Sequence, residues 1–250
     1  MKRLIPIFLL FIASLGKAQA DLSGAIEDYH QIARLIKYDS IKKLATLVSY
    51  PLRRENPVPN INSAQEFISY YPILFDKEFK KKVIKFDSSD IFQHNGSYGL
   101  FAGDMWIDED GKIISINHVS ESEKIFSIKL TNEIQSKMYP EIKEWKRNVI
   151  VCESKKYLVR IDDINGHDSL RYISWGKGKQ ISDKPDLVLY GGTSEFQGEQ
   201  GGVVYTFKSG EWSYIIDKVD MCEKPEDCGL FLRILDNDKE VDSYKCVETK

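Results

Sequence analysis

The placement of the cysteines constrains the fold of this 250-residue chain more than any other feature. The four are Cys152, Cys222, Cys228 and Cys246. None occurs from Asp21 to Val151, so cross-linking is confined to the last part of the chain. This distribution predicts two structural parts, a cysteine-free first part and a cross-linked second part.

The first 20 residues have the composition of an export signal. Two basic residues precede a short apolar run from Leu4 to Leu15, and Ala18-Gln19-Ala20 has the small-residue pattern of a cleavage site. The run is too short for a membrane span, and no cysteine follows Ala20 for lipid attachment. We therefore expect cleavage near Ala20 and a soluble periplasmic or secreted protein.

Removal of this segment makes the chain more acidic. It takes away Lys2, Arg3 and Lys17, which leaves 32 basic and 38 acidic residues and a net charge of −6 in place of −3. A chain with this charge is not expected to bind nucleic acid. No second long apolar run is present, so membrane insertion is not expected either.

An even number of cysteines in an exported chain predicts two disulfides. Three pairings are possible. We favour Cys222–Cys228, which closes a small acidic loop, and Cys152–Cys246, which joins the two ends of the second part. A zinc site is the alternative, but the chain has no Cys-x-x-Cys pair, and neither a metal nor another cofactor is expected.

Helical spacing dominates the start of the first part. Apolar residues recur three and four positions apart over 22–36. Ser40 can cap a second helix, and Ser63 with Glu66 forms a capping box for a third. We expect Pro72 to interrupt or restart that third helix.

Strand patterns begin at Asp87. Residues 98–107 and 112–119 flank Asp108-Glu109-Asp110-Gly111, which has the composition of a hairpin turn. A further helix is expected over 122–145. Beyond residue 149 short strands alternate with turn residues, as in a small barrel or sandwich.

The expected fold class is therefore α+β: N-terminal helices packed on a curved antiparallel sheet, followed by a small all-β barrel or sandwich with disulfides. The expected boundaries are 1–20 for the signal, 21–121 for the α+β domain, 122–148 for a connecting helix and 149–250 for the β domain.

The first part resembles the nuclear-transport-factor-2-like, or cone, fold. The order of its elements and the stretch from Gly103 to Ile113 carry the likeness. In that fold a curved sheet surrounds a pocket, and its members include enzymes and pure binding modules. The resemblance implies a pocket lined by four residues, Tyr98, Asp104, Trp106 and His118.

The second part resembles the small barrels of periplasmic lysozyme inhibitors. The likeness rests on its size, a terminal disulfide, and Gly201-Gly202-Val203-Val204-Tyr205 before an aromatic strand. Those inhibitors present a Ser-Gly-x-x-Tyr type segment to the lysozyme cleft, and here Gly201 stands in place of the serine. The resemblance implies a binding loop at Gly201, Gly202 and Tyr205. Exposed aromatic side chains are favoured interface anchors, which adds Trp212 and Tyr214.

Catalytic motifs are scarce in this sequence. It has neither the Gly-x-Ser-x-Gly of a nucleophile elbow nor a phosphate-binding Gly-x-x-x-x-Gly-Lys pattern. His118 is the strongest candidate for acid–base chemistry, with Asp104 to orient it, while His30, His94 and His167 lack a neighbouring histidine for metal binding.

Two function classes remain open, along with a structural envelope module that has no single partner. The first is a non-catalytic exported binding protein, such as an inhibitor or immunity protein that occludes a toxin or cell-envelope hydrolase. Its partner would be another extracytoplasmic protein. The second is a small-ligand binder or enzyme that uses the cone pocket.

Overall fold

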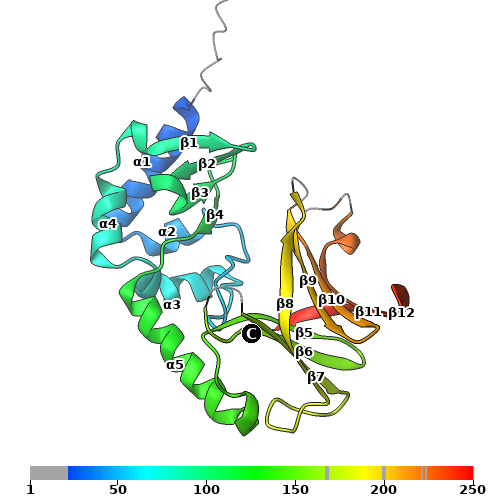
Figure 1. Ribbon diagram of the computed structural model, residues 1–250. Helices are drawn as coiled ribbons and strands as arrows, with labels where there is room; N and C mark the ends of the chain where they lie inside the picture. The colour runs from blue at the N-terminus through cyan, green and yellow to red at the C-terminus, as the bar shows by residue number, and fades with distance from the viewer. Residues whose placement is uncertain (1–21, 167–168, 199–200, 221, 223, 250) are drawn as a thin grey trace, which may run out of the picture. The chain divides into compact units, whose positions relative to one another are not determined.

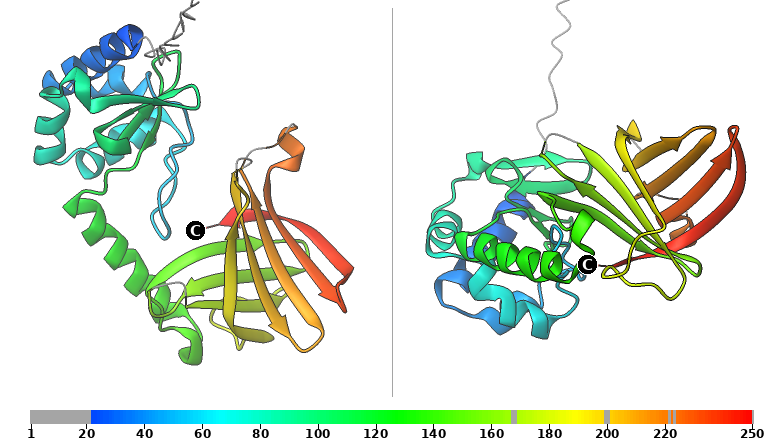
Figure 2. Two further views of the ribbon diagram at one scale, coloured as in Figure 1. Left: turned by 45° about the horizontal axis from the view of Figure 1, so that its top comes forward. Right: turned by 60° about the horizontal axis from the view of Figure 1, so that its bottom comes forward.

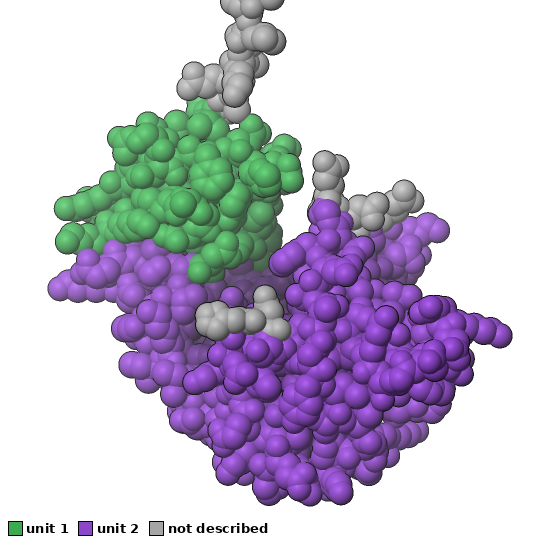
Figure 3. All heavy atoms as spheres, in the orientation of Figure 1, with its two compact units in different colours: residues 1–49, 80–117 green, residues 50–79, 118–250 purple. Residues whose placement is uncertain are grey.

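A computed structural model gives the fold (Figure 1) and describes residues 22–166, 169–198, 201–220, 222 and 224–249. The predicted export signal and His167 lie outside the described residues. The chain divides into two compact units (Figure 3), one of residues 1–49 and 80–117 and one of residues 50–79 and 118–250. None of the described helices is long and apolar enough to span a membrane.

The first unit is built from helices and a four-stranded antiparallel meander in the order β1-β2-β3-β4. Its elements are α1 (Ser23–Lys37), α2 (Ile41–Ala45), β1 (Ile91–His94), β2 (Ser97–Leu100), β3 (Met105–Ile107) and β4 (Ile113–Ile116), and the helix α4 (Lys77–Ile84) enters it from the second unit. The predicted turn at Asp108–Gly111 joins β3 to β4, and the Asp108 carboxylate accepts from the backbone N–H groups of Asp110 and Lys112 at 3.1 and 2.8 Å. The strand expected over 98–107 is instead broken by a 3₁₀ turn at Phe101–Gly103, where Phe101 and Ala102 have positive φ.

One face of this sheet forms the core of the first unit. Its side chains are buried and apolar: Ile91, Leu100, Met105, Ile107, Ile113 and Ile116. Helix α1 contributes Tyr29, which is fully buried and whose hydroxyl donates to the carbonyl oxygens of Tyr98 and Met105 at 2.8 and 3.1 Å. These bonds fix α1 to β2 and β3, and burial raises the pKa of the Tyr29 hydroxyl.

The helical part of the second unit consists of α3 (Ala64–Leu74) and α5 (Glu121–Lys137). The Ser63 cap is confirmed, because its side chain accepts from the Glu66 N–H at 3.2 Å. The expected break at Pro72 was wrong: α3 runs through it to Leu74, since burial of three apolar side chains on this helix offsets the lost backbone bond. Helix α5 ends at Lys137 rather than near 145.

A buried ion pair holds α5 to the extended segment before α3. Arg54 donates from Nε to the Glu123 carboxylate at 2.7 Å, and both side chains are only 4% exposed. Arg54 also donates to the His118 carbonyl at 3.2 Å. Because a buried charge needs a partner, these two residues depend on each other.

The rest of the second unit is a closed eight-stranded antiparallel barrel, seen from two further sides in Figure 2. The strands are β5 (Arg147–Glu153), β6 (Tyr157–Asp163), β7 (Leu170–Gly176), β8 (Leu187–Phe196), β9 (Gly202–Ser209), β10 (Trp212–Val219), β11 (Gly229–Asp236) and β12 (Lys239–Thr249). Of the two expected architectures, barrel and sandwich, the chain forms the barrel. Pairing of β12 with β5 closes it, at Val247 with Glu153 and at the two residue pairs that follow.

Both predicted disulfides are confirmed. Cys152 and Cys246 link β5 to β12 beside the closing seam, with 5.3 Å between their Cα atoms. Cys222 and Cys228 close the loop between β10 and β11, with 5.6 Å between theirs. The first bond therefore joins the two ends of the barrel sequence.

Strand β8 changes partner along its length and forms a corner of the barrel. Its first residues pair with β7, and Thr193–Phe196 pair with β9. The change falls at Gly191, which has a positive φ of 73°, and Gly192, whose Cα faces the Phe207 ring. Gly191 thus provides the positive φ of the bend, and Gly192 leaves the space that the Phe207 ring occupies.

Large apolar side chains fill the barrel. The buried members are Ile150, Cys152, Val159, Ile161, Leu170, Tyr172, Phe207, Ile216, Leu230, Leu232, Ile234 and Cys246. Outside the barrel, Trp145 and Met138 from the segment after α5 cover Ile173 and Trp175 of β7.

Candidate functional site

Two of the four residues expected to line a cone pocket, Tyr98 and Trp106, lie on neighbouring strands of the first unit. Tyr98 lies opposite Ile107 in the β2–β3 register and Trp106 lies opposite Gly99, so strand alternation places the two aromatic side chains on opposite faces of the sheet. The Trp106 ring instead packs edge-on against Phe92, with 5.1 Å between centroids. The inner face carries the apolar core described above.

Asp104 and His118 each have a separate partner. The Asp104 carboxylate pairs with Lys82 at 2.7 Å. The His118 ring stacks on Phe79, with centroids 4.0 Å apart, and its Nε2 lies 3.5 Å from the Asp76 carboxylate. The expected orientation of His118 by Asp104 has no support in these contacts.

Of the three aromatic residues expected to bind a partner, two face the barrel interior and one is exposed. Tyr205 faces the barrel interior opposite Ile216, and Tyr214 lies on the same side, with its ring centroid 5.5 Å from that of Tyr172. Burial raises the pKa of Tyr214. Trp212, at the tip of the β9–β10 hairpin, is 41% exposed.

The predicted glycine loop is a turn between β8 and β9. The Gly201 N–H donates to the Gly198 carbonyl at 3.3 Å, and the Gln197 N–H donates to the Gly202 carbonyl at 3.1 Å. Gly202 has a φ of 113°, and a Cβ there would meet the carbonyl oxygen of Lys218 on β10. Glycine is required here by both the conformation and the close approach.

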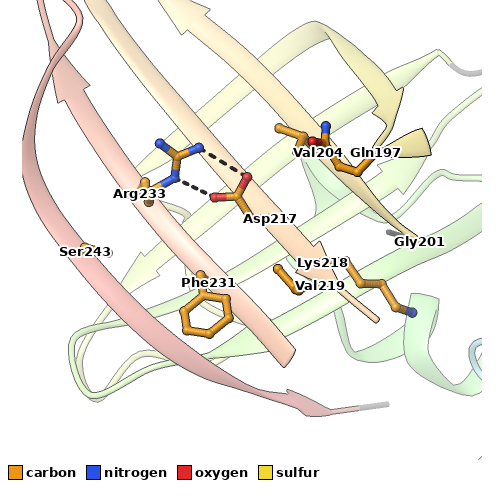
Figure 4. Close-up of a pocket in the computed structure, with 9 residues that line it drawn as sticks. All are labelled: Gln197, Gly201, Val204, Asp217, Lys218, Val219, Phe231, Arg233 and Ser243. Carbon is orange, nitrogen blue, oxygen red and sulfur yellow. Dashed lines mark hydrogen bonds and ion pairs between the residues drawn. The ribbon is translucent and has the colours of Figure 1, made fainter. Parts of the chain in front are cut away.

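Beside this turn the outer face of β9–β12 holds an open pocket of about 310 Å³, which we call the sheet-face pocket (Figure 4). Its lining residues are Gln197, Gly201, Val204, Asp217, Lys218, Val219, Phe231, Arg233 and Ser243. The pocket thus brings the predicted Gly201 together with side chains from all four strands.

An ion pair dominates the chemistry of the sheet-face pocket. Arg233 donates from Nε to one Asp217 oxygen at 2.5 Å and from Nη2 to the other at 3.2 Å, and Figure 4 shows the two side chains facing each other. The hydrogen bond with Asp217 raises the pKa of Arg233, so the guanidinium stays charged. Its side chain is 35% exposed, against 16% for Asp217, which leaves a face of the cation open to a partner.

Apolar surface lies next to this cation. Phe231 and Val204 line the pocket. The Lys245 Nζ atom lies 5.4 Å from the centroid of the Phe231 ring. On β12, Val247 is 68% exposed. The combination of aromatic and arginine side chains is the one enriched at protein interfaces.

Sequence reasoning missed Asp217, Phe231 and Arg233. Alternation along Trp212–Ile216 could have placed Asp217 on the outer face, opposite to Ile216. The register of β10 and β11, which sets Asp217 opposite Phe231 and Ile215 opposite Arg233, cannot be read from spacing alone.

In the part of the chain that the structure describes, no group of three histidine, cysteine, aspartate or glutamate side chains is placed to hold a metal ion. Comparison with known proteins found no matching family model, no matching curated protein and no matching solved structure.

Proposed function

We propose that this protein is an exported, non-catalytic binding protein that engages another extracytoplasmic protein through the outer face of β9–β12. Its concrete form is an inhibitor or immunity protein that occludes a toxin or a cell-envelope hydrolase. The observation that carries the proposal is the sheet-face pocket, where Arg233 stands beside Phe231 and Val204.

Preorganisation supports this use of the pocket. Because Asp217 already holds Arg233 at two points, the arginine loses little side-chain freedom when a partner binds. The volume of about 310 Å³ lies at the lower limit of small-molecule sites. An open pocket of that size suits a side chain projecting from a partner protein.

The packing of the barrel supports recognition on its outer surface. Phe207, Leu232 and Ile216 are buried inside it. The disulfides and the export-signal composition of the first 20 residues support an extracytoplasmic partner.

Site-specific photo-crosslinking in the source cells tests the proposal. A photoreactive residue replaces Ser243, which is exposed and lines the pocket, and in a matched control it replaces Lys42, an exposed residue of α2. We expect one protein adduct from position 243 and none from position 42. The purified adduct partner should then lose activity when the wild-type protein is added. Equal adducts from both positions, or none from position 243, would contradict the proposal.

A further inference from the structure

A second pocket lies at the rim of the barrel, where the β5–β6 hairpin meets the loop that joins β7 to β8. Because Tyr157 at the start of β6 pairs with Gly176 at the end of β7, these two connections are neighbours. The pocket has a volume of about 460 Å³ and is lined by residues 153–158 and 176–181. We call it the rim pocket.

Positive charge gathers in the rim pocket although the chain as a whole is acidic. Four of its lining residues are lysines: Lys155, Lys156, Lys177 and Lys179. Glu153 is its one acidic lining residue. Cationic side chains that line one pocket repel each other, and an anion bound between them would relieve this repulsion.

Two of the four lysines have carboxylate partners. Lys156 lies 3.2 Å from Asp242, and Lys179 pairs with Asp186. Within the described residues, Lys155 and Lys177 are exposed and have no acidic partner. Each of the two connections therefore brings one uncompensated ammonium group to the same pocket.

Local contacts order the β5–β6 and β7–β8 connections that line the rim pocket. Lys156 Nζ lies 5.5 Å from the Tyr157 ring centroid and 5.8 Å from that of Tyr244. In the β7–β8 loop, the Asp186 carboxylate accepts from the Gly176 N–H at 2.7 Å, and Gly178 has a φ of 88°. The two connections are thus held in place before any ligand enters.

We propose that the rim pocket binds a small anion with two or more phosphate or carboxylate groups, held by Lys155 and Lys177. One anionic group can meet each free ammonium, and the volume accommodates a molecule larger than a single phosphate. This site is independent of the proposed protein interface on β9–β12.

Calorimetric titration of the full chain with pyrophosphate and with citrate, at low ionic strength, tests the proposal. We expect saturable one-to-one binding of at least one of them, weakened about tenfold in the Lys155→Gln/Lys177→Gln variant because two charge-assisted contacts are lost. The variant Lys42→Gln/Lys43→Gln, which changes the net charge equally at exposed positions of α2, should bind like the wild type. Binding of pyrophosphate alone would assign a phosphate ligand, and binding of citrate alone a carboxylate ligand.

The absence of saturable binding for both anions, or equal weakening in the two double variants, would overturn the proposal. Amide NMR shifts of the wild-type protein give a second measurement that needs no variant. The signals of Gly176 and Gly178 should move during the titration. Shifts confined to β9–β12 would place the anion elsewhere and would also overturn it.

Discussion

Arg233 of β11 reaches across to Asp217 of β10 and meets its carboxylate at two points, 2.5 and 3.2 Å from the two oxygens. The carboxylate is the more buried of the two groups, so the pair presents the guanidinium rather than the acid to solvent. The ion pair thus fixes the guanidinium on the sheet face, where Glu240 lies 3.9 Å from its Nη1. The proposed interface depends on this guanidinium.

At the corner of β8, the addition of one methyl group at Gly192 should lower the stability of the fold strongly. In Gly192→Ala the new Cβ would lie within 2.5 Å of Phe207 ring atoms, and this ring is buried. We expect the free energy of unfolding to fall by about 1 to 3 kcal/mol, measured by urea denaturation. Gly24→Ala, where a Cβ meets no atom within 4 Å, is the matched control and should cause no loss. Combining Gly192→Ala with Phe207→Leu should recover part of the stability, and a fully stable single variant would contradict the steric account.

The two disulfides should contribute unequally. Cys152–Cys246 spans a sequence separation of 94 residues and Cys222–Cys228 one of 6. In the chain-entropy model their removal costs roughly 4 to 5 and roughly 2 kcal/mol. Hydrogen exchange of the paired serine variants checks this. Protection should fall in the barrel strands after loss of Cys152–Cys246 but persist in β1–β4. Equal loss of protection in β1–β4 would contradict the prediction that the chain has two independent parts.

For the buried pair of Arg54 and Glu123 we predict that the effects of the two single substitutions on stability are not additive. Removing one partner leaves an uncompensated buried charge, so Arg54→Met or Glu123→Leu alone should cost about 3 to 5 kcal/mol of unfolding free energy. The double variant should be markedly more stable than either single variant. Urea denaturation of all four proteins gives the coupling energy. Strictly additive losses would show that the two side chains act independently.

Asp76 predicts a pH-dependent contribution to stability. The Phe79 N–H, 2.8 Å from its carboxylate, is the main cause of the lowered pKa of Asp76, and His118 lowers it further. A depressed folded-state pKa adds stability above the unfolded value, and this contribution is lost as pH falls through the folded value. Asp76→Ala should therefore cost about 1 kcal/mol at neutral pH, as for a helix cap.

The difference between wild type and Asp76→Ala should shrink as pH falls below the ordinary pKa of an aspartate, about 4, and on through the lowered folded-state pKa of Asp76. Thermal melts across this range measure it. As a control, Ser136→Ala on α5 removes an exposed hydroxyl and should give a difference independent of pH. A gap for Asp76→Ala that widens toward acid would contradict the assigned sign.

Local chemistry explains which parts of the fold could be predicted. The Ser63 cap, the Asp108–Gly111 turn and the Cys222–Cys228 bond involve residues close together in the sequence, where residue preferences are strong. The Cys152–Cys246 pair was predictable because four cysteines allow only three sets of pairings. The closure of β12 on β5 depends on pairing between distant segments. The corner in β8 is the clearest case, because Gly191 and Gly192 have the composition of a turn but lie inside one strand.

The same limit applies to the site. The glycines at 201 and 202 marked the β8–β9 turn correctly because positive φ favours glycine. Tyr205 and Tyr214 were predicted as contacts from residue type, but register sets them inside the barrel. Arg233 could be identified as a candidate only from its ion pair with Asp217 on the neighbouring strand. Its role in binding stays a prediction.

The most direct test of the central claim is the affinity of the crosslinked partner for wild-type protein and for Arg233→Gln. The proposed interface predicts a loss of about tenfold to a hundredfold with little change in the melting temperature, since partly exposed ion pairs add little stability. Arg53→Gln breaks another arginine–aspartate pair, 2.9 Å from Asp220, and should bind like the wild type. An affinity of Arg233→Gln equal to that of the wild type would contradict the account.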